Sequence, residues 1–456
     1  MQKQWLREEL MNLNYQEEYR QKLRTPEEAV KAVKSGDWVD YTSNLGFPVL
    51  LDRALAERRD ELHDVKIRGN LIFGPIETVE CDPKREHFIY NSWHCSSYER
   101  SLCDRNLCNF IPMVFRNVTA YYEHFLTVNV AMISVPPMDK HGFFNLSCAT
   151  GVARGILDKA DIVILEVNEK LPYIYGLFED SIHISEVDYV VEGEHGSLPE
   201  FPAQPATEAE KQIADFIIPY ITDGATLQLG IGALPTIIGK RLAGSDVSDL
   251  GMHTELCGDA YLDLYKAGKL TNRTKSFFRN KGVTGMLFGS AELYRWADRN
   301  PFVAVAPISY VNSPEVIGTF HNMISINSCI AVDLYGQICS ESAGLRQISG
   351  TGGQLDYLTG ASMSPGGKAF ICMPSTFIDR NGVRHSTIVP YFHGDIITDP
   401  RSQAYFIVTE YGVANLAGRS TWERAEMLVS IAHPDFRDEL IRAAEEQKIW
   451  IRSNKR

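Results

Sequence analysis

Two apolar runs of strand length limit the folds that this chain can adopt more than any other feature. They are VNVAMISV at Val128–Val135 and DIVILEV at Asp161–Val167. Their β-branched residues favour a strand over a buried helix. Strands that are apolar on both faces are typical of parallel sheets covered by helices on each side. The sequence therefore predicts an α/β architecture.

The second half of the chain repeats this alternation of short strands with turns and helical stretches. Its strand-like runs are LQLGIG, FVAVAPI, CIAVDLYG, AFICM and YFIVTE. Between the halves, the segment Val191–Thr207 (VEGEHGSLPEFPAQPAT) has no periodicity and is rich in Pro, Gly and acidic residues, as expected of a linker. We therefore predict two α/β domains of similar size, 1–195 and 208–456, with mostly parallel sheets. Residues 196–207 link them, and the active site is expected between them.

Two helix starts have strong local signals. Residues 1–35 are predicted to be helical, with a fresh start at Thr25, which is followed by Pro26 and two acidic residues. A second helix is predicted to begin at Thr207, where Glu210 stands at the spacing of a capping box.

The composition argues against nucleic acid as a partner and against secretion or insertion into a membrane. The formal net charge is −13, so no basic surface for nucleic acid is expected. The N-terminus has no apolar signal-peptide core, and no apolar run approaches the roughly 18 residues of a membrane helix. The nine cysteines are scattered and include no CxxC pair, a pattern that favours reduced thiols over disulfides or a zinc site. These features predict a soluble, cytoplasmic protein.

A glycine turn lies between a predicted strand and a predicted helix at Leu227–Pro235 (LQLGIGALP). Gly230 and Gly232 would let backbone amides approach a ligand, and a helix beginning near Pro235 would favour an anion. An ordinary strand-to-helix turn is the alternative. The segment lacks the full GxGxxG motif and the later acid of a dinucleotide site.

A carboxylate, Glu255, stands near the end of a short strand-like segment at Gly251–Asp259 (GMHTELCGD). Catalytic groups are often placed at such strand ends or loop tips. Alternation along a strand puts His253 on the same face, so an acid–base pair is one interpretation. A solvated surface glutamate and a packing histidine are the alternatives.

A third segment, Ser349–Asp356 (SGTGGQLD), is dense in glycine and therefore in exposed amides. It is interpreted either as an oxyanion or phosphate nest or as a flexible turn. A fourth segment, Val135–Asn145 (VPPMDKHGFFN), is a proline-stiffened loop after a buried strand.

Taken in order, the four segments resemble the acetyl-CoA hydrolase/transferase family, in particular its 4-hydroxybutyrate and butyrate:acetyl-CoA CoA-transferases. The resemblance extends over essentially the whole chain and rests on VPPMDKHGFF, GIGALP, HTE and GTGGQLD. It implies that Glu255 is the nucleophile and that Gly353 contributes to CoA binding and the oxyanion site. It also implies that CoA contacts Ile330 and the loop formed by Gly230, Ile231, Gly232, Ala233 and Leu234.

The resemblance implies an enzyme that moves CoA from a short-chain acyl-CoA (acetyl-, butyryl- or 4-hydroxybutyryl-CoA) to a carboxylate such as acetate. The implied mechanism is ping-pong and passes through a glutamyl-CoA thioester. CoA is a substrate, and no metal or other cofactor is expected. The enzyme is expected to be a homo-oligomer, in the simplest case a dimer. An acyl-CoA hydrolase using the same glutamate is the nearest alternative. A nicotinamide-dependent dehydrogenase and a non-catalytic CoA-binding module are more distant ones. The sequence leaves the physiological acyl pair open.

Overall fold

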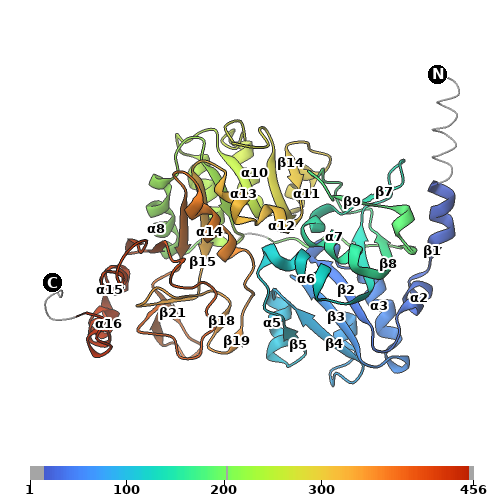
Figure 1. Cartoon of the computed structure of the whole chain (residues 1–456), viewed down its shortest axis with the longest axis horizontal. Coiled ribbons are helices and arrows are strands. Elements are labelled where there is room, and N and C mark those ends of the chain that lie inside the picture. The colour runs from blue at the N-terminus through green and yellow to red at the C-terminus, as the bar shows by residue number, and fades with distance from the viewer. Residues whose placement is uncertain (1–14, 202–203, 451–456) are drawn as a thin grey trace. The chain divides into compact units, whose positions relative to one another are not determined.

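The computed structural model describes residues 15–201 and 204–450. Internal contacts divide the chain into two compact units (Figure 1). Unit 1 contains the residues up to Phe201 and also Val283–Val311. Unit 2 contains Pro202–Gly282 and the residues from Asn312 onward. Unit 1 thus ends inside the predicted linker segment 196–207 and also takes in a piece of the second half of the chain.

Unit 1 is built on a sheet of eight strands in which every neighbouring pair is parallel. In spatial order its strands are β1 (Leu23–Arg24), β10 (Tyr189–Glu192), β8 (Ala160–Val167), β6 (Val128–Val135), β2 (Trp38–Ser43), β3 (Val65–Asn70), β4 (Phe88–Ser92) and β5 (Cys108–Phe110). Strand β6 coincides with the first predicted run, and β8 contains the second. The predicted α/β class is confirmed.

The other elements of unit 1 are helices and short strands. The helices are α2 (Pro26–Ala29), α3 (Val49–Glu57), α4 (Glu77–Glu80), α5 (Ser97–Asp104), α6 (Val118–His124), α7 (Thr150–Lys159), α11 (Ala291–Ala297) and α12 (Ile308–Val311). The strands are β7 (Phe143–Asn145), β9 (Ser181–His183), β14 (Val303–Val305) and β13 (Gly282–Leu287), of which the first residue, Gly282, is assigned to unit 2.

Unit 2 is organised around a second sheet. The strands that unit 2 contributes are, in spatial order, β12 (Gly251–Cys257), β11 (Thr226–Leu229), β15 (Met323–Ser328), β20 (Lys368–Cys372), β24 (Phe406–Thr409) and β25 (Gly412–Asn415). The pairs from β12 to β24 are parallel, and β25 is antiparallel at the edge. The carboxyl ends of β12, β11 and β15 therefore lie at one edge of the sheet, where α/β proteins tend to bind ligands.

The helices of unit 2 are α8 (Glu208–Ile217), α9 (Ala233–Ala243), α10 (Asp259–Lys266), α13 (Pro314–Gly318), α14 (Gln354–Met363), α15 (Thr421–Ile431) and α16 (Pro434–Glu446). Its small strands are β16 (Ala331–Asp333), β17 (Ile338–Cys339), β18 (Ser342–Ala343), β19 (Arg346–Gln347), β21 (Thr376–Ile378), β22 (Arg384–Ser386) and β23 (Ile388–Val389). Within 15–201 and 204–450, none of the helices has the length and apolarity that a membrane crossing requires.

Both predicted helix starts are confirmed as complete capping boxes, at Thr25 and at Thr207. The prediction of helix over 1–35 is wrong in part. Of this range, 1–14 lies outside the described residues and 15–22 is helical, but Leu23–Arg24 pairs with β10 instead. A pairing with residues so far along the chain overrides local helix propensity.

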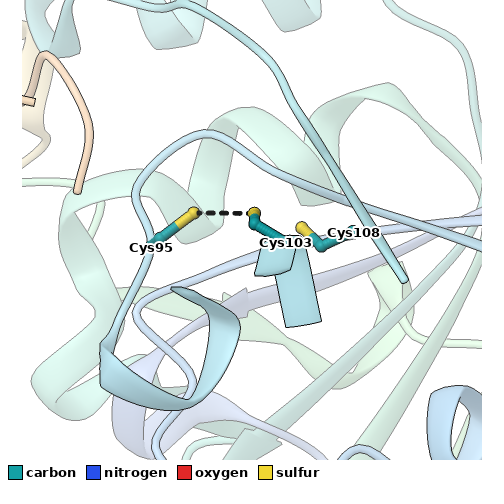
Figure 2. Close-up of side chains that lie close together, drawn as sticks. All are labelled: Cys95, Cys103 and Cys108. Atoms are coloured by element: carbon teal, nitrogen blue, oxygen red, sulfur yellow. Dashed lines mark hydrogen bonds between the residues drawn. The ribbon is translucent and has the colours of Figure 1, made fainter. Parts of the chain in front are cut away.

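All nine cysteines are free thiols, but they are less scattered in space than in sequence. Cys95, Cys103 and Cys108 converge beside the edge strand β5, as Figure 2 shows.

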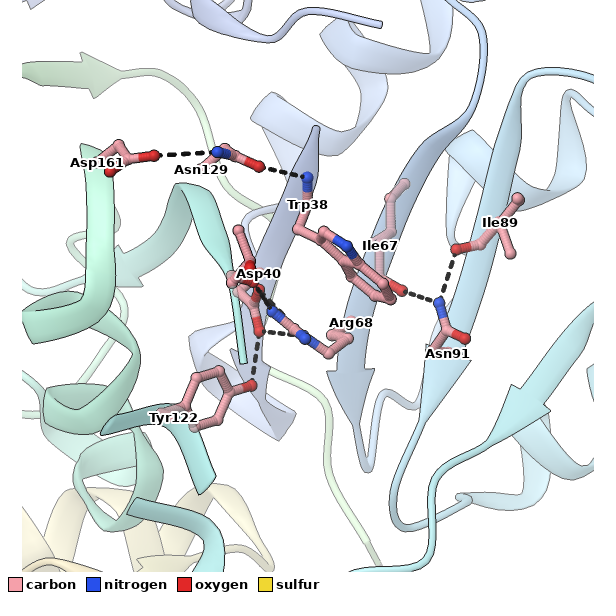
Figure 3. Close-up of polar contacts among 10 residues, drawn as sticks. Trp38, Asp40, Ile67, Arg68, Ile89, Asn91, Tyr122, Asn129 and Asp161 are labelled. Carbon is pink, nitrogen blue, oxygen red and sulfur yellow. Dashed lines mark hydrogen bonds and ion pairs between the residues drawn. The ribbon is translucent and has the colours of Figure 1, made fainter. Parts of the chain in front are cut away.

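A buried ion pair joins β2 to β3 in the middle of the first sheet (Figure 3). Arg68 Nη2 lies 2.7 Å from Asp40 Oδ2, and Arg68 Nε lies 3.0 Å from Asp40 Oδ1. Tyr122 donates to the same carboxylate at 2.6 Å, and the guanidinium lies 4.4 Å from the centre of the Trp38 ring. Asp40 therefore has three donors in place of water, which makes a buried carboxylate tolerable.

We expect Arg68→Met to destabilise unit 1 by about 3 to 5 kcal/mol, because it leaves the Asp40 carboxylate buried without its partner. The double variant Asp40→Leu/Arg68→Met should recover most of that loss, since neither charge remains. The measurement is urea unfolding followed by circular dichroism. A double variant as unstable as Arg68→Met would show that packing, and not the unpaired charge, is responsible.

Candidate active site

Glu255 lies within β12, two residues before the strand ends at Cys257. The sequence predicted a strand end or loop tip, and the structure places the residue just inside the strand, with its side chain partly exposed. The other predicted member of an acid–base pair, His253, is fully buried and its ring lies 4.6 Å from that of Phe320. This environment favours a packing role for His253.

The side-chain amide of Asn312 donates a short hydrogen bond to the Glu255 carboxylate. Asn312 Nδ2 lies 2.7 Å from Glu255 Oε2 and 3.2 Å from Asp356 Oδ2. Asn312 and Asp356 are both fully buried. One amide group therefore bridges two carboxylates, of which only Glu255 is partly open to solvent.

Gly353 lies directly against the Glu255 carboxylate, and its backbone N–H is a second hydrogen-bond donor to that group. A methyl group at position 353 would lie 2.0 Å from both Glu255 Oε2 and Asn312 Nδ2. The residue has an ordinary backbone conformation, with φ −104°. Glycine is therefore needed at 353 for space and not for its backbone freedom.

Close helix packing holds Asn312 in this position. Asn312 occupies the turn before α13, and Gly353 caps the N-terminus of α14. The two helices approach closely at Gly360, where an added Cβ would lie 2.4 Å from Ile317 Cβ. This contact places the turn of Asn312 over the first turn of α14, which carries Asp356.

Electrostatics shift the acidity of Glu255 strongly. Burial raises the pKa of its carboxyl group to about 7, and the negative charge of Asp356 acts in the same direction. The hydrogen bonds from Asn312 and Gly353 oppose this rise by stabilising the charged form. A partly exposed carboxyl group with a pKa near neutrality is typical of catalytic acids, bases and nucleophiles.

The predicted glycine loop leaves the sheet at the same edge. Strand β11 pairs with β12 in parallel register, and Thr254 Oγ1 donates to the Leu229 carbonyl at 3.2 Å. Tyr261 of α10 fixes the end of β11, accepting from Leu229 N–H and donating to the Leu227 carbonyl. The loop thus starts beside Glu255.

Within this loop, Gly232 has φ +113°, a conformation that side chains rarely adopt, and α9 begins at Ala233, two residues earlier than predicted. Ile231 is 42% exposed, whereas Leu234 is buried at the start of the helix. An added Cβ at Gly230 would have only one neighbour within 4 Å, Pro235 Cγ at 3.9 Å. The loop is therefore open on its outer side, but its part in CoA binding stays a prediction.

Ile330 lies two residues beyond the carboxyl end of β15 and immediately before β16, not inside a strand as expected. Its amide donates to the Cys339 carbonyl at 2.8 Å, and its side chain is partly exposed. Its contact with CoA likewise stays a prediction.

Family profiles match both halves of the chain. The profile "Acetyl-CoA hydrolase/transferase N-terminal domain" matches residues 8–199, and the profile of the corresponding C-terminal domain matches 289–444. The chain belongs to the acetyl-CoA hydrolase/transferase family. The resemblance drawn from the four sequence segments is confirmed.

Several members of this family are similar over nearly their full length. The butyryl-CoA:acetate CoA-transferase of Anaerostipes caccae is 46% identical, covering 97% of this chain and all of the relative. The 4-hydroxybutyrate coenzyme A transferase of Clostridium kluyveri is 37% identical over 94% of this chain and 98% of the relative. The crystal structure of RipA from Yersinia pestis matches with a TM-score of 0.88 at 34% identity, covering 96% of this chain and all of RipA. The acetyl-CoA hydrolase of Candida albicans is only 22% identical, over 92% of this chain and 88% of the relative.

Two residues of the candidate site, Asn312 and Asp356, were not predicted from the sequence. Asp356 closes the GTGGQLD motif but carried no predicted role, and Asn312 lies in no motif singled out. The pairing of Asn312 with Glu255 spans 57 positions. Only the Ser313-Pro314 pair, a helix start signal, marks its turn in the sequence.

The pKa of Glu255 predicts how activity depends on pH. If Glu255 is the nucleophile that the sequence predicts, its carboxyl group must be ionised to react. Below about pH 7 that group is protonated, so kcat/KM should fall by up to about tenfold per pH unit. Asp356→Asn removes a like charge and should move the acidic limb of the pH profile, where kcat/KM falls, about one pH unit lower. Asn312→Ala removes a donor to the charged form and should move it higher. The measurement is a pH profile of kcat/KM for each variant.

The matched control for this profile is Asp246→Asn, which removes the same charge from an exposed position of unit 2. It should leave the limb in place. If Asp356→Asn and Asn312→Ala shifted the limb in the same direction, the opposing roles assigned to these residues would be wrong.

Gly353→Ala should lower kcat by about a hundredfold or more, because the added methyl group displaces Glu255 or Asn312 and disturbs a donor. Gly244→Ala is the control, since the added methyl there meets only backbone oxygens at 3.8 Å. Steady-state kinetics and thermal unfolding are compared for the two variants. Equal losses of kcat, or a loss explained by unfolding, would contradict the close approach at 353.

Proposed function

We propose that this protein is a CoA-transferase that moves CoA from a short-chain acyl-CoA to a carboxylate acceptor, with Glu255 as nucleophile. Acetyl-, butyryl- and 4-hydroxybutyryl-CoA are the candidate donors, and acetate is a candidate acceptor. The observation that carries the proposal is the arrangement at one sheet edge of a partly exposed Glu255, the Asn312 amide 2.7 Å away, and Gly353 in contact with both. The names of the similar transferases support the substrate class.

In the first step, the Glu255 carboxylate attacks the carbonyl carbon of the acyl-CoA. The carbon–sulfur bond breaks, giving an acyl-glutamyl anhydride and CoA thiolate. Negative charge builds on the carbonyl oxygen as this happens. Fixed N–H donors such as the Asn312 amide and the Gly353 backbone are the kind of group that stabilises it, each worth about 3 kcal/mol in comparable sites.

In the second step, the thiolate attacks the glutamyl carbonyl and expels the acyl group as a free carboxylate. Glu255 is then a glutamyl-CoA thioester, and an acceptor carboxylate reverses the two steps to leave as a new acyl-CoA. A protein carboxylate thus divides a difficult exchange into easier halves. The raised pKa of Glu255 makes its ionised form a stronger nucleophile than an ordinary glutamate.

The glycine loop is our proposal for one wall of the CoA site. It starts beside Glu255, and its backbone amides precede α9, so the loop and the helix start suit a negatively charged group. The residues proposed for CoA contact are Gly230, Ile231, Gly232, Ala233, Leu234, Ile330 and Gly353.

A hydrolase would use the same glutamate but let water take the place of the acceptor. Transfer is favoured because the transferases are 46% and 37% identical to this chain and the hydrolase only 22%. We also propose that the reaction itself needs no cofactor beyond CoA as substrate, and that the enzyme is a cytoplasmic homo-oligomer. The nine free thiols support a reducing compartment.

We expect a covalent thioester on Glu255 when the enzyme is incubated with acyl-CoA in the absence of acceptor. Digestion and mass spectrometry should find CoA attached to the peptide that contains Glu255, and Glu255→Gln should give neither this adduct nor turnover. Initial rates at several fixed acceptor concentrations should give parallel double-reciprocal plots, since the first carboxylate leaves before the second binds.

A panel of acyl-CoA donors and carboxylate acceptors, with free thiol measured alongside, separates transfer from hydrolysis. Acyl transfer should exceed thiol release for at least one pair. Thiol release that accounts for all turnover would make the enzyme a hydrolase, and full activity in Glu255→Gln would remove Glu255 from the mechanism.

A further inference from the structure

Three cysteines of unit 1 come from a loop, a helix and a strand but meet at one place. Cys95 precedes the capped start of α5, Cys103 lies in the last turn of α5, and Cys108 is the first residue of the edge strand β5. Figure 2 shows their sulfur atoms gathered between these elements. In the part of the chain that the structure describes, no other group of three or more Cys, His, Asp or Glu side chains is arranged to hold a metal ion.

The spacing of the sulfur atoms matches the geometry of a thiolate metal site. Cys95 Sγ and Cys103 Sγ lie 3.8 Å apart, and all three sulfur atoms lie within 4.8 Å of one another. A tetrahedral zinc ion with Zn–S bonds of about 2.3 Å requires sulfur atoms about 3.8 Å apart. Small side-chain rotations would therefore bring the third sulfur into place.

The burial of the three thiols also suits a bound metal ion. Cys95 and Cys108 are buried, whereas Cys103 is partly exposed and leaves a route for an ion to enter. A bound metal ion would stabilise the thiolate form of the three side chains.

We propose that Cys95, Cys103 and Cys108 bind one soft, thiophilic metal ion, of the class of Zn²⁺, through three thiolates. Binding releases the protons of those thiols that are still protonated, and the fourth coordination position is left for water on the exposed side of Cys103. Soft thiolate ligands select ions of this class over Mg²⁺ or Ca²⁺. This inference does not rest on the proposed function, since Glu255 belongs to unit 2.

The role of such an ion would be to fasten the edge of the first sheet. It would tie the segment after β4, the end of α5 and strand β5 to one another. Strand β5 is three residues long and, within the described part of the chain, pairs with β4 alone. An ion bound to the folded state raises its stability by mass action.

The test titrates the chelator-treated enzyme, kept reduced with a phosphine, with Zn²⁺ against a chromophoric competitor. We expect one Zn²⁺ per chain and a raised midpoint of thermal unfolding. Co²⁺ in place of Zn²⁺ should give sulfur-to-metal charge-transfer absorption. Cys103→Ser, at the partly exposed ligand, should weaken Zn²⁺ binding at least about tenfold and abolish the absorption band.

Cys81→Ser is the matched control, because Cys81 is also a partly exposed thiol of unit 1 but lies outside the cluster. It should bind Zn²⁺ like the parent enzyme, and circular dichroism should show that both variants are folded. Cys95→Ser gives a second, independent loss of a ligand. The proposal is overturned if the reduced enzyme binds no Zn²⁺, or if Cys81→Ser weakens binding as much as Cys103→Ser.

Discussion

The contact between the Glu255 carboxylate, the Asn312 amide and Gly353 is the constraint around which the candidate site of unit 2 is arranged. A carboxylate that is mostly removed from water must find donors in the protein. Here they come from a turn 57 residues later and from the cap of α14. The parallel order of β12, β11 and β15, the packing of α13 on α14, and the absence of a side chain at 353 are all needed to bring them together.

This arrangement sets the reactivity of Glu255 by opposing effects. Burial and the charge of Asp356 raise the pKa of the carboxyl group, and the two donors lower it, with a result of about 7. A higher pKa makes the carboxylate a better nucleophile but leaves less of it ionised at neutral pH. Asn312 therefore has two functions in our mechanism, because the same amide that holds the carboxylate can stabilise the oxyanion that follows.

In unit 1, polar contacts hold the strands of a wide parallel sheet together. In its middle, Arg68 of β3 donates hydrogen bonds from Nε and Nη2 to the Asp40 carboxylate of β2, and Tyr122 donates to the same carboxylate. At one edge, β5 pairs with β4 alone among the residues that the structure describes. The metal ion that we propose for the cysteine cluster would join that strand to α5. Edge strands are the least protected part of a sheet, so a fastening at this point has a physical purpose.

The sequence by itself determined the elements that depend on near neighbours. The run Val128–Val135 became β6 and Thr207 became a helix cap. An apolar β-branched run and a capping box are both signals carried by residues within a few positions of one another. The family motifs also located Glu255 and Gly353. Only the tertiary structure brought Asn312 to Glu255, because that pairing depends on how parallel strands and helices far apart in sequence are packed. The same reason applies to the three clustered cysteines. They come from a loop, a helix end and a strand, so the sequence contains no short Cys-x-x-Cys spacing that would predict a metal site.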